Sequence, residues 1–156
     1  MIPFHFLILS VLIALGQVGC SDGHDHEHSH FEPHHHEPPH GGAGVTLGDE
    51  AAHIEFLADV DAGTVTAWFF RPHMEGYLRI QAVSFEVIAN LPDGEDRLTF
   101  HAVANAGTGE TVGDTSQFVA QADWLAGAES FDALLPEVSV RGTVYRNVAF
   151  NYPKGN

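Results

Sequence analysis

The sequence is poor in cysteine and in basic residues. Cys20 is the single cysteine among 156 residues, which excludes an intrachain disulfide. The chain has six lysine and arginine residues against 21 acidic residues, and no lysine or arginine precedes Arg71. Because the formal net charge is −15, the chain repels phosphate backbones, and we expect no nucleic-acid partner. The same charge attracts cations and raises their local concentration.

Sequence motifs typical of enzymes are also missing. The chain has no phosphate-binding loop, no dinucleotide-binding G-x-G-x-x-G, no H-E-x-x-H and no serine in a nucleophile elbow. We therefore predict a protein that is not an enzyme.

The chain opens with an apolar leader. The run from Phe4 to Leu15 is almost continuously apolar. It is shorter than the roughly 20 residues that a membrane-spanning helix needs, and it is typical of a signal-peptide core. We predict a signal peptide over residues 1–19 and export to the periplasm.

The residues after the apolar run suggest a lipid anchor. Gly16-Gln17-Val18-Gly19 precede Cys20, and this pattern resembles the bacterial lipobox, although Gln17 stands where that motif usually has leucine. The resemblance implies that Cys20 is lipidated and anchors the chain to a membrane. Ser21 after the cysteine slightly favours the outer membrane. Two alternatives remain open: an ordinary signal peptide with Cys20 as a bystander, and an uncleaved N-terminal anchor.

Residues 20–42 form a His-rich segment. The segment is nearly free of apolar side chains and contains several prolines, so we expect a disordered tether. Eight of the twelve histidines lie in it: His24, His26, His28, His30, His34, His35, His36 and His40. Neutral imidazoles are good ligands for Zn(II), Cu(II), Ni(II) and Co(II), so we predict that these histidines bind a divalent transition metal. A plain solvated spacer and a pH-responsive tether are the alternatives.

Residues 43–156 have the pattern of an all-β domain. Alternation over His53–Leu57 and a β-branched, aromatic run over Thr64–Phe70 predict two strands, joined by a turn at Asp59–Gly63. We expect further strands over Tyr77–Ala89, Arg97–Ala104 and Ser116–Gln121, and a helical turn over Asp123–Ala128. The clearest hairpin signal is Arg141-Gly142, between strands at Ser130–Val140 and Thr143–Tyr152. About seven short strands predict an antiparallel, Ig-like β-sandwich.

Three further histidines lie in this domain. We expect His53 and His101 on strands, on the face opposite the main apolar residues, and His73 in a loop beside Met74. A surface or hydrogen-bonded role is the commoner one for such histidines. We keep all three as secondary metal-ligand candidates and favour His73, because loop residues carry function more often and Met74 adds a soft donor.

Short motifs in the domain resemble a known family. Pro39-His40-Gly41-Gly42, then Leu47-Gly48-Asp49 and His53-Ile54-Glu55-Phe56, are similar to the N-terminal periplasmic domain of adaptor (membrane-fusion) subunits of RND-type heavy-metal efflux pumps. Asn151-Tyr152-Pro153-Lys154-Gly155-Asn156 is similar to the ending of small His-rich bacterial lipoproteins. We expect none of the lipoyl-like, hairpin and barrel domains of an adaptor, so the resemblance does not imply a full adaptor role.

The resemblance implies metal handling in the periplasm. Together with the histidines, it predicts a lipoprotein that buffers divalent metal or hands it over for efflux, with a pump or its adaptor as the expected partner. The sequence leaves the metal, its stoichiometry and the oligomeric state open. The alternative is a non-enzymatic interaction module on a flexible tether.

Overall fold

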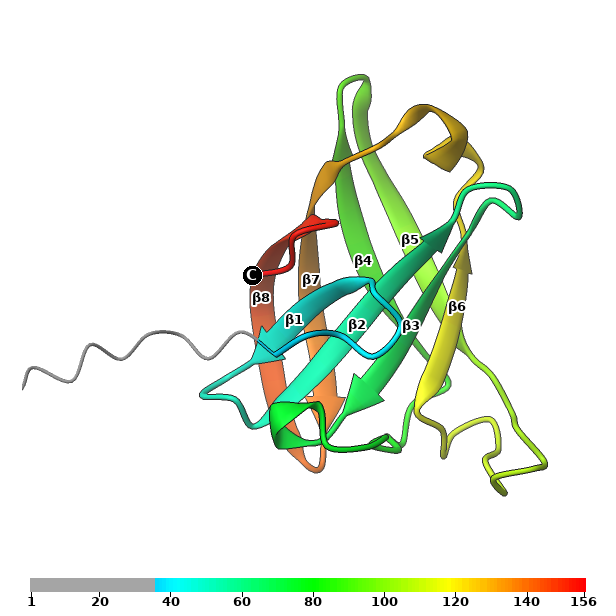
Figure 1. Ribbon diagram of the computed structural model, residues 1–156, viewed down its shortest axis with the longest axis vertical. Helices are drawn as coiled ribbons and strands as arrows, with labels where there is room; N and C mark the ends of the chain where they lie inside the picture. The colour runs from blue at the N-terminus through cyan, green and yellow to red at the C-terminus, as the bar shows by residue number, and fades with distance from the viewer. Residues whose placement is uncertain (1–35) are drawn as a thin grey trace, which may run out of the picture. The chain divides into compact units, whose positions relative to one another are not determined.

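The computed structural model describes residues 36–156, which form eight antiparallel strands and two short 3-10 helices (Figure 1). The strands are β1 (Ala43–Leu47), β2 (Ala52–Asp59), β3 (Thr64–Phe70), β4 (Ser84–Leu91), β5 (Gly94–Ala102), β6 (Gln117–Gln121), β7 (Phe131–Val140) and β8 (Thr143–Tyr152). The 3-10 helices are η1 (Pro72–Met74) and η2 (Asp123–Gly127). The predicted all-β, antiparallel fold class is confirmed, with eight strands where about seven were expected. Among the described residues, neither helix has the length or the apolar character that crossing a membrane requires.

The predicted signal peptide, Cys20 and the histidines from His24 to His35 lie outside the described residues. Their roles in export, lipidation and metal binding stay predictions.

All eight strands belong to one sheet, in the order β1-β2-β3-β6-β5-β4-β7-β8. The sheet curves round until its two edge strands, β1 and β8, contact each other (Figure 1). The C-terminal residue completes this seam: the Asn156 backbone N–H donates to Gly44 O at 3.3 Å, and its side-chain Oδ1 accepts from Thr46 N at 2.8 Å. The two layers of the sandwich are thus opposite halves of a single, nearly closed sheet.

Phenylalanine side chains from both halves of the sheet meet in the core. Phe56 of β2 stacks on Phe150 of β8, with ring centroids 4.7 Å apart, and meets Phe100 of β5 edge-on at 5.5 Å. Phe69 of β3 and Phe118 of β6 pack edge-on at 5.6 Å. Each such ring removes a large apolar area from water, so this cluster holds the two halves together.

Several predicted elements occur close to their expected bounds. β3 has the predicted limits, and Arg141-Gly142 forms the β7–β8 turn with φ of 51° and 82°, as a type I′ hairpin requires. The predicted strand over Tyr77–Ala89 is regular only from Ser84. The residues before it are attached by the isolated bridges Phe70↔Tyr77 and Ile80↔Thr115. β1 is absent from the sequence-based prediction.

Residues 36–42 were predicted to belong to the disordered tether, but they pack against the sheet. The His40 ring stacks on Trp68 of β3, with centroids 4.0 Å apart, and the Gly41 N–H donates to Pro38 O at 3.0 Å. Their presence explains why His53 and Glu55 of β2, expected on the outer face, are both buried. The folded domain therefore begins before Gly42.

Candidate metal centre

Strand register brings three candidate ligands to one end of the β1-β2-β3 part of the sheet. His53, near the start of β2, pairs with Thr46 of β1 on one side and with Phe70, the last residue of β3, on the other. Glu50 lies three residues before His53, in the β1–β2 turn, and His73 lies three residues after Phe70, in η1. Antiparallel pairing therefore places the two connections beside each other.

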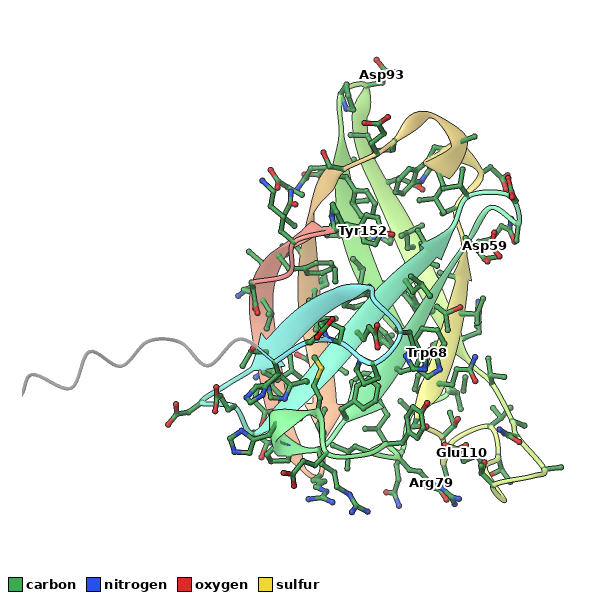
Figure 2. The ribbon with its side chains drawn as sticks, viewed as in Figure 1. Asp59, Trp68, Arg79, Asp93, Glu110 and Tyr152 are labelled. Carbon is green, nitrogen blue, oxygen red and sulfur yellow. The ribbon has the colours of Figure 1, made fainter. Side chains whose placement is uncertain are left out.

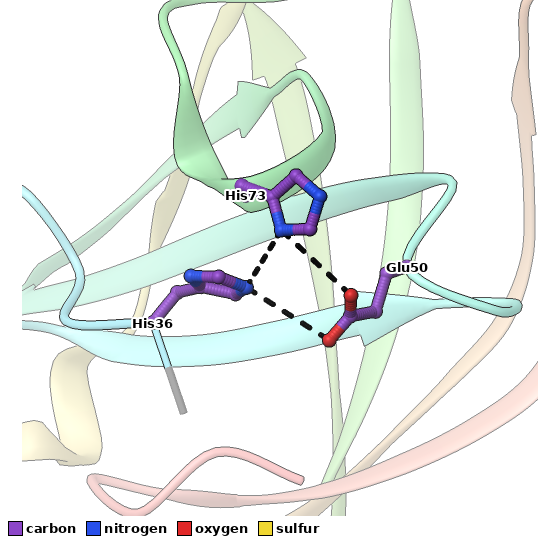
Figure 3. A group of neighbouring side chains, drawn as sticks. All are labelled: His36, Glu50 and His73. Carbon is purple, nitrogen blue, oxygen red and sulfur yellow. Dashed lines mark hydrogen bonds and ion pairs between the residues drawn. The ribbon is translucent and has the colours of Figure 1, made fainter. Parts of the chain in front are cut away.

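His36, Glu50 and His73 form a compact histidine–glutamate group (Figure 3). Each offers one ligand atom, and these atoms all lie within 4.8 Å of one another. His36 Nε2 is 3.1 Å from His73 Nδ1 and 3.8 Å from Glu50 Oε1, while His73 Nδ1 is 3.8 Å from Glu50 Oε2. Three segments far apart in the sequence thus present two imidazole nitrogens and a carboxyl group to one point.

These spacings match the ligand shell of a small cation. Zn(II) binds imidazole nitrogen at about 2.0–2.1 Å, so two ligands at tetrahedral angles are about 3.3 Å apart. The 3.1 Å nitrogen pair is slightly inside that value. The two 3.8 Å nitrogen–oxygen distances, which run to different oxygen atoms of Glu50, are slightly outside it. Side-chain rotation would be needed to bring one carboxylate oxygen atom and both nitrogen atoms around one ion.

The backbone at this group is held in an unfavourable conformation. Glu50, His73 and Met74 have φ of 52°, 57° and 56°, in the left-handed region that residues with a side chain rarely adopt. Each such residue costs about 1–2 kcal/mol, and strain of this kind concentrates at functional sites. Two of the three ligand candidates are therefore presented at an energetic cost.

His53 lies against this group and is almost fully buried, at 2% exposure. Its ring meets the His36 ring edge-on, with centroids 5.5 Å apart, and its Nδ1 is buried without a hydrogen-bond partner. Burial lowers the pKa of His53 below 6.5, as do His36 and His73, while a hydrogen bond with the Arg71 backbone and the nearby Glu50 oppose the change. His53 is therefore neutral near pH 7, the form that binds metals.

His40 has a different environment from His36. Its Nδ1–H donates to Glu55 Oε2 at 2.7 Å, and the Tyr77 hydroxyl group is 3.1 Å from its Nε2. Glu55 is fully buried, and its Oε1 also accepts the backbone N–H groups of His40 and Gly42, each at 2.8 Å. This arrangement, here named the His40 latch (His40, Gly42, Glu55), attaches the end of the His-rich segment to β2.

The two remaining candidates of the folded domain, His101 and Met74, lie outside the histidine–glutamate group. His101 is exposed on β5, where it pairs with Val119 of β6, and it is not part of the histidine–glutamate group. Met74, suggested as a soft donor, has its methyl group over Gly44 of β1, next to Pro38. Among the described residues, the geometry thus assembles His36 and His73, adds His53 as a neighbour and leaves His101 apart.

Sequence reasoning did not find Glu50. It lies in a turn without any recognisable motif, and its only signal is an acidic side chain three residues before a histidine. The importance of Glu55 was also missed, because an alternating strand places it on the face expected to be solvated.

A second polar cluster lies in the loop between β5 and β6. The carboxyl group of Glu110, largely buried, accepts hydrogen bonds from Ser116 N at 2.8 Å, Ser116 Oγ at 2.6 Å and Thr108 Oγ1 at 2.5 Å. Arg79 Nε lies 3.9 Å from Glu110, and Figure 2 shows both residues at the same end of the sheet. Internal hydrogen bonds satisfy this carboxyl group, so it serves the loop rather than a ligand.

Comparison of the chain with family models, curated proteins and solved structures gave no match. The functional conclusion therefore rests on the residues and their geometry.

Proposed function

We propose that this chain is a periplasmic, membrane-anchored lipoprotein that binds divalent transition metals through its His-rich segment and the adjoining histidine–glutamate group. Zn(II), Cu(II), Ni(II) and Co(II) are the metals that imidazole ligands suit. The observation that carries the proposal is the meeting of His36, from the segment, with Glu50 and His73, from two connections of the folded domain. These three residues have no sequence proximity that would explain their convergence.

The charge and the exposure of the group fit metal capture. The chain carries a formal net charge of −15, which attracts divalent cations. His73 is exposed, and His36 and Glu50 are partly exposed, so an ion can enter from solvent. The proposed role is to buffer metal or hand it over for efflux, with a pump or its adaptor as partner and Cys20 as the lipid attachment point.

Calorimetric titration of Zn(II), Cu(II) and Ni(II) into the full chain tests the proposal. We expect micromolar or tighter binding at pH 7.5 that is lost below about pH 6, because imidazoles must be neutral to coordinate. Replacing His36 and His73 by alanine should remove the tightest site and leave weaker binding by the other histidines of the segment. His101→Ala is the matched control and should change nothing.

The same titration identifies failure. If no metal binds the full chain better than about 100 μM, which corresponds to only about −5.5 kcal/mol, the metal function is refuted. The non-enzymatic interaction module on a tether would then replace it, and a search for a protein partner would follow.

A further inference from the structure

His53 has a buried nitrogen atom with no partner in its surroundings. The residue is only 2% exposed. Among the described residues, its Nδ1 is one of two buried side-chain polar atoms that have no hydrogen-bond partner. A buried polar atom left unpaired costs about 1–3 kcal/mol. Such an atom in a native structure calls for an explanation, and a bound ion or water is one of the common ones.

The position of His53 suggests what that use is. Its ring meets the His36 ring edge-on at 5.5 Å, and the His36 ring meets the His73 ring edge-on at 4.9 Å. The unpaired nitrogen atom is thus in the residue that borders the histidine–glutamate group on its buried side.

The three known members of the group leave a coordination position unfilled. Structural sites for Zn(II) have four protein ligands in tetrahedral arrangement, whereas catalytic sites keep one position open. His36, Glu50 and His73 supply three ligand atoms from the solvent side. The His53 nitrogen atoms are not among the ligand atoms that lie within 4.8 Å of one another. The torsion that turns an imidazole ring about its Cβ–Cγ bond is broad, and turning the His53 ring about this bond would bring a nitrogen atom toward the group.

We infer that His53 is the fourth ligand, and that His36, Glu50, His53 and His73 form a closed, four-coordinate site for a tetrahedral divalent ion, Zn(II) or Co(II). This inference deepens the proposed function and rests on it, because it assigns the geometry and the metal class of the same site. A closed site holds its ion and does not present an open position to substrate.

The closed site has a mechanical consequence for the His-rich segment. His36 is the only one of the four ligands that comes from the segment. Glu50 belongs to the β1–β2 turn, His53 to β2 and His73 to η1, after β3. An ion bound there links the segment to the domain four residues before the His40 latch. The six histidines of the segment that precede His36 are then available to exchange metal, while the closed site fixes the segment's end.

The test uses the full chain with six segment histidines replaced by serine, so that the four proposed ligands dominate binding. The replaced residues are His24, His26, His28, His30, His34 and His35. Co(II) is the probe, because four-coordinate Co(II) absorbs visible light strongly and six-coordinate Co(II) weakly. Zn(II) affinity is then measured by competition with the bound Co(II).

The decisive variant is His53→Leu, with His101→Leu as the matched control on another strand. We expect the strong Co(II) absorption in the parent, its loss in His53→Leu, and a fall in Zn(II) affinity of about 100-fold or more, since even outer-shell partners are worth 10–100-fold. His101→Leu should keep both properties. If His53→Leu retains the absorption and affinity, the fourth-ligand assignment is overturned and the proposed function stands.

Two further results separate the remaining cases. If the parent and a His36→Ala, His73→Ala variant bind Co(II) and Zn(II) equally poorly, both the inference and the metal function of this group fail. If His53→Leu does not fold, nitrogen NMR of the histidine rings in the parent protein decides whether His53 binds the ion. A large Zn(II)-induced shift of a His53 ring nitrogen supports the assignment, and an unchanged resonance at saturation overturns it.

Discussion

Glu55 and His53 show how neighbouring residues of one strand acquire roles that their strand position does not suggest. Both point to the outer face of β2, and both are buried, because residues 36–42 and η1 contribute cover on that side. Glu55 is satisfied by three hydrogen-bond donors of the His40 latch, whereas His53 keeps an unpaired Nδ1. The same burial therefore stabilises the fold at one position and preserves a free nitrogen at the other.

Glu55→Ala should destabilise the domain by about 3 kcal/mol, because three donors lose their shared acceptor inside a buried site. Glu55→Gln keeps an oxygen atom that can accept the two backbone N–H groups, so its loss should be clearly smaller. Urea unfolding of both variants, with linear extrapolation, gives the two values. Equal losses, or a loss below about 0.5 kcal/mol for the alanine variant, would contradict the latch.

The metal-free protein should lose stability as the pH falls below 6.5. Burial lowers the pKa of His53 from 6.5 in the folded state, so the unfolded chain binds the proton more readily. The stabilising contribution is present above 6.5 and declines as the pH drops toward the folded-state pKa. Urea midpoints between pH 5 and pH 8, with a chelator present, measure the slope. The stability of His53→Leu should depend less steeply on pH. If the parent and the variant show the same dependence of stability on pH, the lowered pKa of His53 does not cause the loss of stability.

The β5–β6 connection depends on one acidic side chain. Glu110 lies opposite Asn105 in an isolated bridge, and its carboxyl group joins Thr108 to Ser116, just before β6. Burial raises the pKa of Glu110, but the hydrogen bonds from Ser116 and Thr108 and the nearby Arg79 outweigh it and leave the pKa below 4.5. The loop thereby gains a stable shape although it is rich in glycine.

Glu110→Gln should lower stability at pH 7 by about 1–2 kcal/mol, because the amide accepts fewer of these hydrogen bonds. The depressed pKa means that the contribution of Glu110 is present above 4.5 and is lost as the pH falls below that value. The difference in unfolding free energy between parent and variant should therefore shrink between pH 5 and pH 3. A difference that does not change with pH would show that charge on Glu110 is unimportant.

The seam between β1 and the C-terminal end of the chain closes the sheet. Gly155 has φ of 84° and approaches β1 so closely that a Cβ atom there would lie 2.0 Å from Gly44 O. Only glycine allows this contact, and the contact positions Asn156 for its hydrogen bonds with Gly44 and Thr46. A single small residue thus permits the two edges to meet.

Gly155→Ala should open this seam and cost about 2–3 kcal/mol, which combines the backbone conformation and the clash. Gly142→Ala is the matched control, since Gly142 has a similar φ of 82° with nothing within 4 Å of a Cβ. It should cost only the conformational part, about 1 kcal/mol. Urea unfolding gives both values, and hydrogen exchange of the Thr46 amide reports the seam. Equal costs would mean that the close approach is unimportant.

Local sequence pattern was sufficient for the all-β class and for several elements. The β-branched run of β3 and the Arg141-Gly142 turn have strong local signals, because strand alternation and left-handed turn residues act over a few positions. β1 was missed because it is only five residues long and contains Gly44. The types of possible metal ligand were also evident, since imidazoles have this chemistry wherever they lie.

Only the tertiary structure decided which of these ligands meet. His36, Glu50 and His73 are brought together by the pairing of β1, β2 and β3 and by the packing of residues 36–42, and no local pattern reports contacts between such distant positions. The same packing engages His40 with Glu55 and leaves His101 apart on β5. Residue type determined the chemistry available to this protein, and long-range strand pairing determined where that chemistry is assembled.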